Sequence, residues 1–159
     1  MSEQADVEPF CIEVADWAVA EALVMPVREA VFVCEQGVPP EIERDAMDPL
    51  SRHAIARDAH GRVVGTGRLL PDGHIGRMAV SAPARGAGVG GAVLSALVEE
   101  ARRRRMCEVV LNAQVHALDF YSRHGFEAFG EVFMEAGIEH RAMRRVLPAV
   151  QSGDRAGKW

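Results

Sequence analysis

The sequence predicts an α+β fold in which a mixed, mostly antiparallel sheet is flanked by helices. Residues 52–80 contain three strand-like runs separated by short turn signals, which is typical of an antiparallel meander. Residues 88–105 have the clearest helical periodicity in the chain. Two further strand-like runs follow at 126–135 and 139–147. With the elements described below, we expect about six to seven strands and about four helices.

Length and composition are those of an ordinary globular domain. The chain has 159 residues, of which 48% are hydrophobic and 26% charged. This balance excludes disorder, collagen-like fibres and coiled coils as readings of the whole chain. We assign residues 1–147 to a single domain and residues 148–159 to a disordered tail.

Charge and targeting signals restrict partners and location. The net charge is −5, from 18 basic and 23 acidic side chains, which argues against nucleic-acid or anionic-membrane partners and fits a cationic one better. Residues 1–6 carry acids where a signal peptide has bases, and no run of ~18 apolar residues occurs, so we expect a cytoplasmic protein. Cys11, Cys34 and Cys107 are odd in number and lack a C-x-x-C spacing. We expect reduced, mostly buried thiols and no metal site.

The first elements are read from hydrophobic period. Residues 10–14 alternate apolar and polar, which predicts a strand with one buried face. An amphipathic helix is predicted from about Glu21 to Gly37, provided that Pro26 lies in its first turn or kinks it. Residues 41–48 form an acidic loop without clear periodicity, long enough to suggest a function.

The later elements follow turn and cap signals. Turns are predicted at 58–61 and 71–73 in the meander, and Arg102–Arg105 suit the C-terminal end of the 88–105 helix because its dipole favours positive charge there. A strand at 108–112 and a short helix at 115–124, ended by Gly125, come next. Ala136-Gly137 joins the last two strands.

The most informative stretch is residues 76–91, where a strand runs through glycines into the best helix. Unpaired backbone N–H groups at a helix N-terminus attract anions, and glycine lets a phosphate approach without meeting a Cβ. Arg85 can add a charge-assisted contact. The alternative is a plain strand-to-helix turn in which the glycines relieve strain.

Two common phosphate motifs fit poorly. A Walker A loop needs Gly-Lys, but the only lysine is Lys158. Gly86, Gly88 and Gly91 match G-x-G-x-x-G, yet the next strand ends at Leu111-Asn112 without the acid that a dinucleotide site requires. Coenzyme A is the third candidate.

The sequence resembles the GNAT superfamily of acyl-CoA-dependent N-acyltransferases. Its Q/R-x-x-G-x-G/A pattern is matched by Arg85, Gly88 and Gly90. Residues 77–80 resemble the fourth strand of the family, and residues 117–126 resemble its A-x-x-F-Y-x-x-x-G-F segment. Further likeness to ElaA-like and YjcF-like bacterial proteins lies in residues 31–39, the acids that follow, residues 135–140 and Met143. The resemblance covers about residues 10–147 and implies the GNAT fold, a twisted sheet with splayed central strands.

The resemblance also implies a binding surface for acetyl-CoA. Backbone groups of Met78, Ala79 and Val80 would hold the pantetheine arm as an extra strand and polarise the thioester carbonyl. The pyrophosphate would be cradled by Arg85, Gly86, Ala87, Gly88, Val89, Gly90 and Gly91. Asn112 would meet the pantetheine amides, and Ala117 and Phe120 would complete the surface. Asn112 could instead be a polar strand end or helix cap, and Phe120 also suits the core.

Tyr121 and Glu35 are the predicted catalytic pair. On the family pattern the Tyr121 hydroxyl protonates the leaving thiolate, although Phe120 and Tyr121 could be simple aromatic packing. An alkyl ammonium must lose a proton before it attacks a thioester, so a base is required. Glu35, beside the expected acceptor groove, is the first choice, and His53 and His140 are rivals. The remaining acids of the loop are Glu41, Glu43, Asp45 and Asp48. They could bind a cationic amine, supply the base or simply be solvated.

The sequence therefore predicts an enzyme that moves an acetyl group from acetyl-CoA to a primary amine of a small molecule or peptide. The amine attacks directly in a ternary complex, without a metal. A catalytically silent CoA-binding sensor or interaction module is the alternative, since fold does not guarantee turnover. The acceptor, the acyl chain length and the oligomeric state, a homodimer included, are left open.

Overall fold

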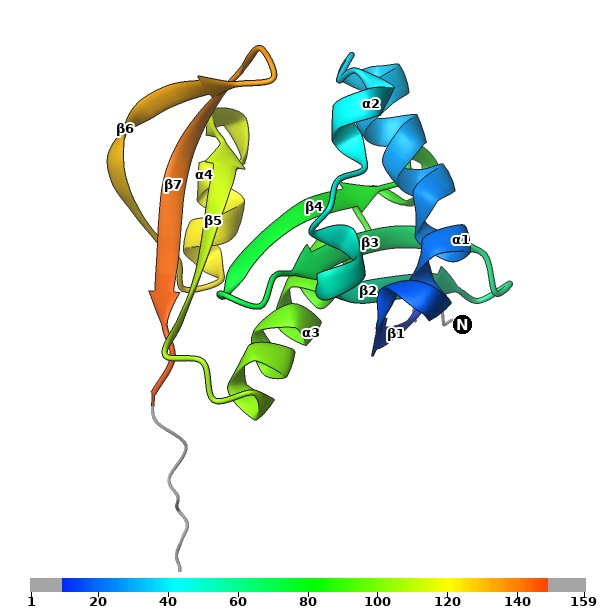
Figure 1. Ribbon diagram of the computed structural model, residues 1–159, viewed down its shortest axis with the longest axis horizontal. Helices are drawn as coiled ribbons and strands as arrows, with labels where there is room; N and C mark the ends of the chain where they lie inside the picture. Colours follow the sequence, from blue (N-terminus) through cyan, green and yellow to red (C-terminus); the bar gives the residue numbers. More distant parts are fainter. Residues whose placement is uncertain (1–9, 149–159) are drawn as a thin grey trace, which may run out of the picture.

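A computed structural model describes residues 10–148, and its single sheet confirms the predicted mixed, mostly antiparallel architecture. Seven strands run in the order β1-β2-β3-β4-β5-β7-β6, and only the β4–β5 pair is parallel (Figure 1). The strands are β1 Phe10–Ala15, β2 Arg52–Asp58, β3 Val63–Leu69, β4 His74–Val80, β5 Glu108–Gln114, β6 Glu127–Glu135 and β7 Ile138–Val146. The principal helices are α1 Trp17–Arg28, α2 Pro40–Glu43, α3 Val89–Arg103 and α4 Leu118–Arg123.

The first helix starts earlier than predicted and changes its winding. Asp16 caps it, because its side chain accepts a hydrogen bond from the Val19 amide at 3.3 Å. Pro26 lies well inside α1, where it removes one backbone donor, and the chain continues as a π-helix, η2, over Glu29–Glu35. The segment ends at Gly37, as predicted, in a left-handed conformation with φ of 75°.

Local structure in the other segments follows the sequence closely, with three differences. The acidic loop contains α2 and a 3-10 turn, η3, at Asp48–Leu50. The β5 strand extends two residues beyond the predicted Asn112. The predicted helix at 115–124 divides into a 3-10 turn, η5 at Val115–Ala117, and α4.

The two central strands splay apart, as the family resemblance implied. The parallel β4–β5 ladder consists of His74 opposite Val110 and Ile75 opposite Leu111, and no later residues pair. A bulge shifts the β3–β4 register, and Arg77 lies within it at a φ of 50°. Bulges bend a strand and increase its twist, so β4 turns away from β5 after Ile75. Figure 1 shows the resulting V between the two strands.

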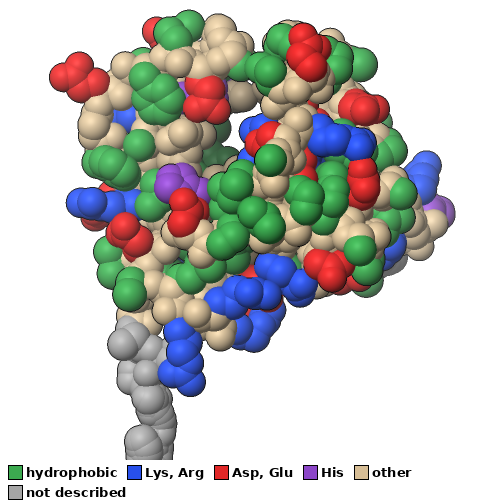
Figure 2. Space-filling model, in the orientation of Figure 1, with side chains coloured by type: hydrophobic (Ala, Val, Ile, Leu, Met, Phe, Trp, Pro, Cys, Tyr) green, Lys and Arg blue, Asp and Glu red, His purple; other side chains and the backbone are tan. Residues whose placement is uncertain are grey.

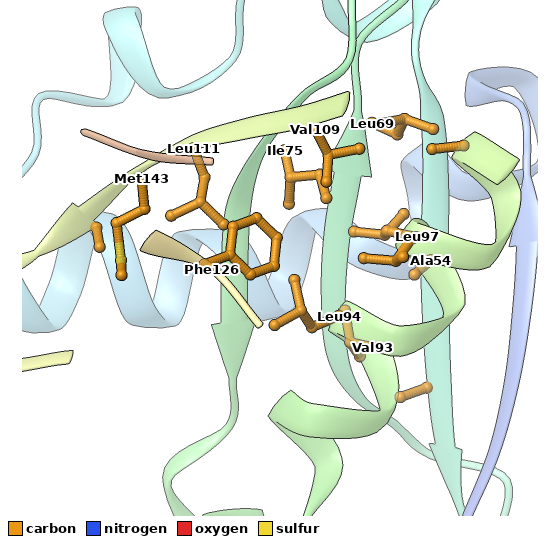
Figure 3. Close-up of a cluster of buried hydrophobic side chains, with 14 of the residues drawn as sticks. Ala54, Leu69, Ile75, Val93, Leu94, Leu97, Val109, Leu111, Phe126 and Met143 are labelled. Atoms are coloured by element: carbon orange, nitrogen blue, oxygen red, sulfur yellow. The ribbon is translucent and has the colours of Figure 1, made fainter. Parts of the chain in front are cut away.

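One hydrophobic core joins both arms of this V. Side chains of α3 pack against the sheet, and the cluster extends across Ile75 and Leu111 to Phe126 and Met143 (Figure 3). A second cluster lies under α1 and includes Trp17, Val24 and Ile55. Because alternate strand residues face opposite sides, α1 and α3 cover the two faces of the sheet. Apolar packing therefore holds β4 and β5 together where they still pair, and it leaves the space between their diverging ends open.

Two expectations about the chain need comment. The prediction of mostly buried thiols was wrong, because Cys11, Cys34 and Cys107 are all exposed. Their positions on β1, on the π-helix and before β5 place them outside the apolar clusters. The predicted disordered tail lies, apart from Pro148, outside the described residues. Within residues 10–148, no helix has the length and apolar character needed to cross a membrane.

Candidate active site

A cavity of about 700 Å³ occupies the opening between β4 and β5. Figure 2 shows it as a hollow between the part of the molecule formed by β5–β7 and the part that carries α2. Of the residues predicted for the site, the cavity wall contains Glu35, Met78, Ala79, Val80, Arg85, Asn112, Ala117 and Tyr121. Segments far apart in the sequence thus converge on one concave surface.

The glycine-rich turn, residues 85–91, presents backbone donors. The N–H groups of residues 86–91 have no hydrogen-bond acceptor in the described part of the chain. Gly86 and Gly88 are left-handed, with φ of 85° and 87°, and Gly88 is the N-cap of α3. A Cβ at Gly86 would meet nothing within 4 Å, so the space around these donors is open. This is the geometry of an anion site at a helix N-terminus.

The free edge of β4 supplies the second part of the predicted donor site. From Gly76 to Val80 this strand bonds to β3 on one side only, because β5 has already diverged. An extended ligand can therefore add to β4 as a further strand. Asn112 faces this opening from β5, and its side-chain amide lies 3.4 Å from the Glu135 carboxylate.

Arg85 and Glu35, predicted for different roles, form one ion pair. Arg85 Nη2 donates to Glu35 Oε1 at 2.7 Å, and Arg85 Nε donates to the Val80 carbonyl at 3.0 Å. Both side chains are more than a third exposed, at 46% and 39%. The pair joins the end of the π-helix to the start of the glycine-rich turn.

Tyr121, the predicted general acid, lies in the cavity wall. Burial raises the pKa of its phenol to about 12, and its ring packs edge-on against Phe120 and Phe126, with centroids 5.0 and 6.1 Å away. Aromatic packing and access to the cavity therefore coexist. Phe120 is not part of the cavity wall; it packs against the hydrophobic core and lies 3.6 Å from where a Cβ on Gly90 would be.

The acidic loop is bound to arginines that sequence reasoning did not connect with it. Arg28 donates to Glu43 at 2.6 Å and to Asp48 at 2.9 Å. Arg68 donates to both Asp48 and Asp45 at 2.7 Å. Arg77 adds a 3.0 Å bond to Asp45 and holds the Glu43 carbonyl at 2.9 Å. We call this set the ion-pair network; its members are Arg28, Glu43, Asp45, Asp48, Arg68 and Arg77.

The network favours the ionised form of Asp45 and Asp48. Burial opposes the charge of Asp48, but hydrogen bonds from Arg28 and the Asp45 amide, and the arginine charges, lower its pKa to about 2. The hydrogen bond from Arg68 likewise lowers the pKa of Asp45. The charges of Glu43, Asp45 and Asp48 are thus paired with arginines and do not face a cationic amine alone. Glu41 is exposed and lies outside the cavity wall. The loop carries no free excess of negative charge into the cavity.

The two rival histidines occupy different environments. His53 is buried beside Trp17, its Nε2 is 2.9 Å from the Asp48 carbonyl, and it does not reach the cavity. Burial lowers its pKa. His140 does line the cavity, with Nδ1 2.7 Å from the Ile138 carbonyl.

Sequence reasoning missed a chain of polar contacts across the cavity. The Gln114 amide donates to Gln36 Oε1 at 3.1 Å, and His116 Nε2 lies 2.7 Å from Gln114 Oε1. This chain links the end of the π-helix to β5, across the V. No signal pointed to Gln114, because the predicted strand stopped before it. Within residues 10–148, no cluster of three or more His, Cys, Asp or Glu side chains is arranged to hold a metal ion.

A splayed β4–β5 pair beside a glycine-rich helix start defines the class of acyl-CoA N-acyltransferases, and comparison with known proteins agrees. The sequence model of one protein family, described as the acetyltransferase (GNAT) domain, matches residues 20–147. The chain therefore belongs to the GNAT acetyltransferase family, which confirms the resemblance seen in the sequence.

Individual relatives support the same assignment. The chain is similar to YjcF of Bacillus subtilis, an uncharacterized N-acetyltransferase, with 40% identity over 123 residues that cover 75% of this chain and 87% of YjcF. The crystal structure of Escherichia coli ElaA shares 29% identity at a TM-score of 0.76, covering 86% of this chain and 99% of ElaA. An acyl-CoA N-acyltransferase from Pseudomonas aeruginosa shares 31% identity at a TM-score of 0.76, with 86% and 99% coverage. These relatives confirm the GNAT fold.

Proposed function

We propose that this protein transfers an acetyl group from acetyl-CoA to a primary amine of a small molecule or peptide. The observation that carries the proposal is that the unpaired N–H groups of residues 86–91 follow directly on the free edge of β4 and on Arg85, which line the cavity. An anion site and a strand-pairing edge side by side suit a ligand with a pyrophosphate followed by an amide-containing arm. Coenzyme A has that chemistry.

The donor is held mainly by the backbone in this proposal. The glycine-rich turn, Arg85 included, binds the pyrophosphate, and Met78, Ala79 and Val80 pair with the pantetheine arm. Asn112 meets the arm from the opposite strand, and Ala117 covers it. A free amide of β4 polarises the thioester carbonyl and stabilises the oxyanion that forms on attack.

The reaction joins the amine nitrogen to the acetyl carbon and breaks the carbon–sulfur bond. An alkyl amine arrives as an ammonium cation and must first lose a proton to a base. A second proton leaves the nitrogen as the amide forms, and one proton goes to the departing sulfur, so one proton is released overall. Tyr121 donates to that sulfur, and its pKa of about 12 keeps the phenol protonated at all physiological pH values. Three of the candidate bases line the cavity: Glu35, His140 and Glu43, the last of which is already bonded to Arg28.

The experiment that tests this function combines binding with turnover. Calorimetry with acetyl-CoA should show binding to the wild type and none to Gly88→Val, because valine strains the left-handed N-cap and fills the approach to the backbone donors. Gly61→Val is the matched control: Gly61 has a φ of 81° and open space around it, but lies in the β2–β3 turn. It should bind acetyl-CoA like the wild type.

Thiol release then separates an enzyme from a silent module. Wild-type protein with acetyl-CoA and a panel of primary amines should release CoASH with at least one of them. Binding without release from any amine would replace the enzyme with the CoA-binding module. Equal affinity in Gly88→Val and wild type would remove the site assignment.

A further inference from the structure

His140 has one ring nitrogen fixed by the backbone and the other one available. Its Nδ1 lies 2.7 Å from the Ile138 carbonyl oxygen. A carbonyl oxygen can only accept a hydrogen bond, so Nδ1 carries the proton in the neutral ring. The lone pair of the neutral imidazole is therefore on Nε2. The backbone has selected the tautomer that a base at Nε2 needs.

The ring is also held in place while Nε2 stays open. His140 is 7% exposed and stacks on Phe133 of β6, with centroids 5.9 Å apart and an interplanar angle of 24°. Nε2 has no hydrogen-bond partner in residues 10–148. Within these residues, the buried side-chain atoms that lack a partner are Glu43 Oε1 and Arg68 Nε, and His140 Nε2 is not among them. Nε2 is therefore not enclosed, and His140 belongs to the cavity wall.

Its rival base, Glu35, is committed elsewhere. Glu35 Oε1 accepts a 2.7 Å bond from Arg85, and the carboxylate would have to leave that arginine before approaching an ammonium. Among the other imidazoles, His53 is outside the cavity, and His116 uses Nε2 to donate to Gln114 Oε1. His74 lines the cavity with Nδ1 3.0 Å from Asp72 Oδ1, but its side chain is 48% exposed. Of these five groups, His140 alone combines a place in the wall with a free lone pair on a buried ring.

We infer that His140 is the general base of acetyl transfer, accepting the proton of the acceptor ammonium at Nε2. The inference rests on the proposed function. The N–H bond of the ammonium breaks and a proton joins Nε2; the freed amine then attacks the thioester carbon, and the imidazolium returns its proton to solvent after turnover. The Nδ1–H bond to the Ile138 carbonyl persists in both states and stabilises the cation. The titratable or charged groups that share the cavity wall with His140 are Glu35, Glu43, Arg68, His74, Arg77, Arg85, His116, Tyr121 and Glu135.

The decisive variant is His140→Asn, measured in single-turnover acetylation of an alkyl amine. The asparagine side-chain amide can replace Nδ1–H on the Ile138 carbonyl, so the hairpin keeps its bond while the base is removed. The rate should fall by about 10² to 10⁴-fold, the usual contribution of a general base. The acidic limb of the pH–rate profile, which reports loss of the base by protonation, should disappear. Acetyl-CoA affinity should be unchanged.

Two further measurements separate a base from a structural role. An aromatic amine is already neutral at pH 7, so its acetylation should be nearly equal in His140→Asn and wild type. Glu35→Gln should keep the acidic limb, and His60→Asn, in an exposed turn outside the cavity, should behave as wild type. If His140→Asn keeps the wild-type rate and limb with alkyl amines, or loses aromatic and alkyl activity alike, the inference is wrong. A wild type that releases no CoASH would instead contradict the proposed function itself.

Discussion

The two sides of the cavity are built on opposite principles. On the donor side, the glycine-rich turn and the edge of β4 present unpaired backbone groups to open space. On the other side, most polar atoms of the ion-pair network are bonded to one another, and among its buried side-chain atoms only Glu43 Oε1 and Arg68 Nε lack partners. One side has open hydrogen-bonding groups, and on the other side most polar groups are already paired with one another.

In our proposal the first side recognises the ligand, and the second side supports the fold. Unpaired N–H groups at a helix N-terminus cost little free energy, because water can bond to them until a phosphate does. Buried ion pairs, by contrast, return little net stability but are costly to break. We therefore expect changes on the donor side to alter binding and catalysis, and changes in the ion-pair network to alter folding.

The largest effect is expected for Asp48→Asn, which tests the supporting side. Asp48 is fully buried and bonded to Arg28 and Arg68 at 2.7–2.9 Å. Removing its charge leaves the arginines under-compensated, and breaking a buried pair costs about 3 to 5 kcal/mol. Urea unfolding should show a loss of that size. Glu13→Gln, which breaks an exposed pair with Arg57, should cost less than about 1 kcal/mol.

The same residue contributes to the acid sensitivity of the wild type. Its pKa is lowered to about 2 in the folded state, from an ordinary 3.8, so its contribution is complete above 3.8 and is lost as the pH falls toward 2. That contribution is about 2 kcal/mol. Asp48→Asn should lack this part of the acid loss. Equal stability of variant and wild type at pH 7 would show that the network is not a support.

A smaller effect is expected for Tyr121→Phe, which should change the rate of acetyl transfer and leave stability unchanged. The phenylalanine ring keeps the packing against Phe120 and Phe126 and removes only the hydroxyl. The Tyr121 phenol, with a pKa of about 12, is a weaker acid than a thiol, with a reference pKa of ~8.5. Full proton transfer from Tyr121 to the thiolate is therefore uphill. Burial raises the pKa of the thiol and so reduces the difference between the two pKa values. Single-turnover rates should fall by about 10²-fold, the lower end for acid catalysis.

The binding and pH behaviour of this variant complete the test. Acetyl-CoA affinity and the urea midpoint should match the wild type, because the hydroxyl has no bonded partner within residues 10–148. An alkaline limb below pH 10 in the wild type could not come from Tyr121. An unchanged chemical step in Tyr121→Phe would leave protonation of the thiolate to water.

The donor side could be predicted from the sequence because its information is local. Glycine spacing, an arginine and the start of an amphipathic helix lie within one short stretch, and backbone geometry follows from them directly. The strands and the 136–137 turn were predictable for the same reason. The π-helix was not, because a proline inside a helix signals a disturbance without specifying its form.

The other side could not be predicted, since its partners are remote in sequence. Arg28 and Arg68 lie 15 or more positions from the acids they bind, and each is ordinary in its local context. A row of acids looks free until the fold brings arginines to it. Likewise, His53 and His140 are equivalent in the sequence, and only tertiary structure places one in the core and the other at the cavity.

The smallest effect is expected for Glu41→Lys, and it is the sharpest check on this comparison. Glu41 is the one exposed acid of the series from Glu41 to Asp48, and it lies outside the main cavity wall. An exposed charge separated from the acceptor by solvent is screened within about 8 Å at physiological ionic strength. The acceptor KM should therefore change by less than about twofold, and stability by less than ~0.5 kcal/mol. Reversing Glu43 or Asp45 as well would disrupt the ion-pair network, so only the single variant reports on substrate attraction. A tenfold rise in the acceptor KM, with unchanged acetyl-CoA affinity, would mean that the acidic loop selects a cationic acceptor after all.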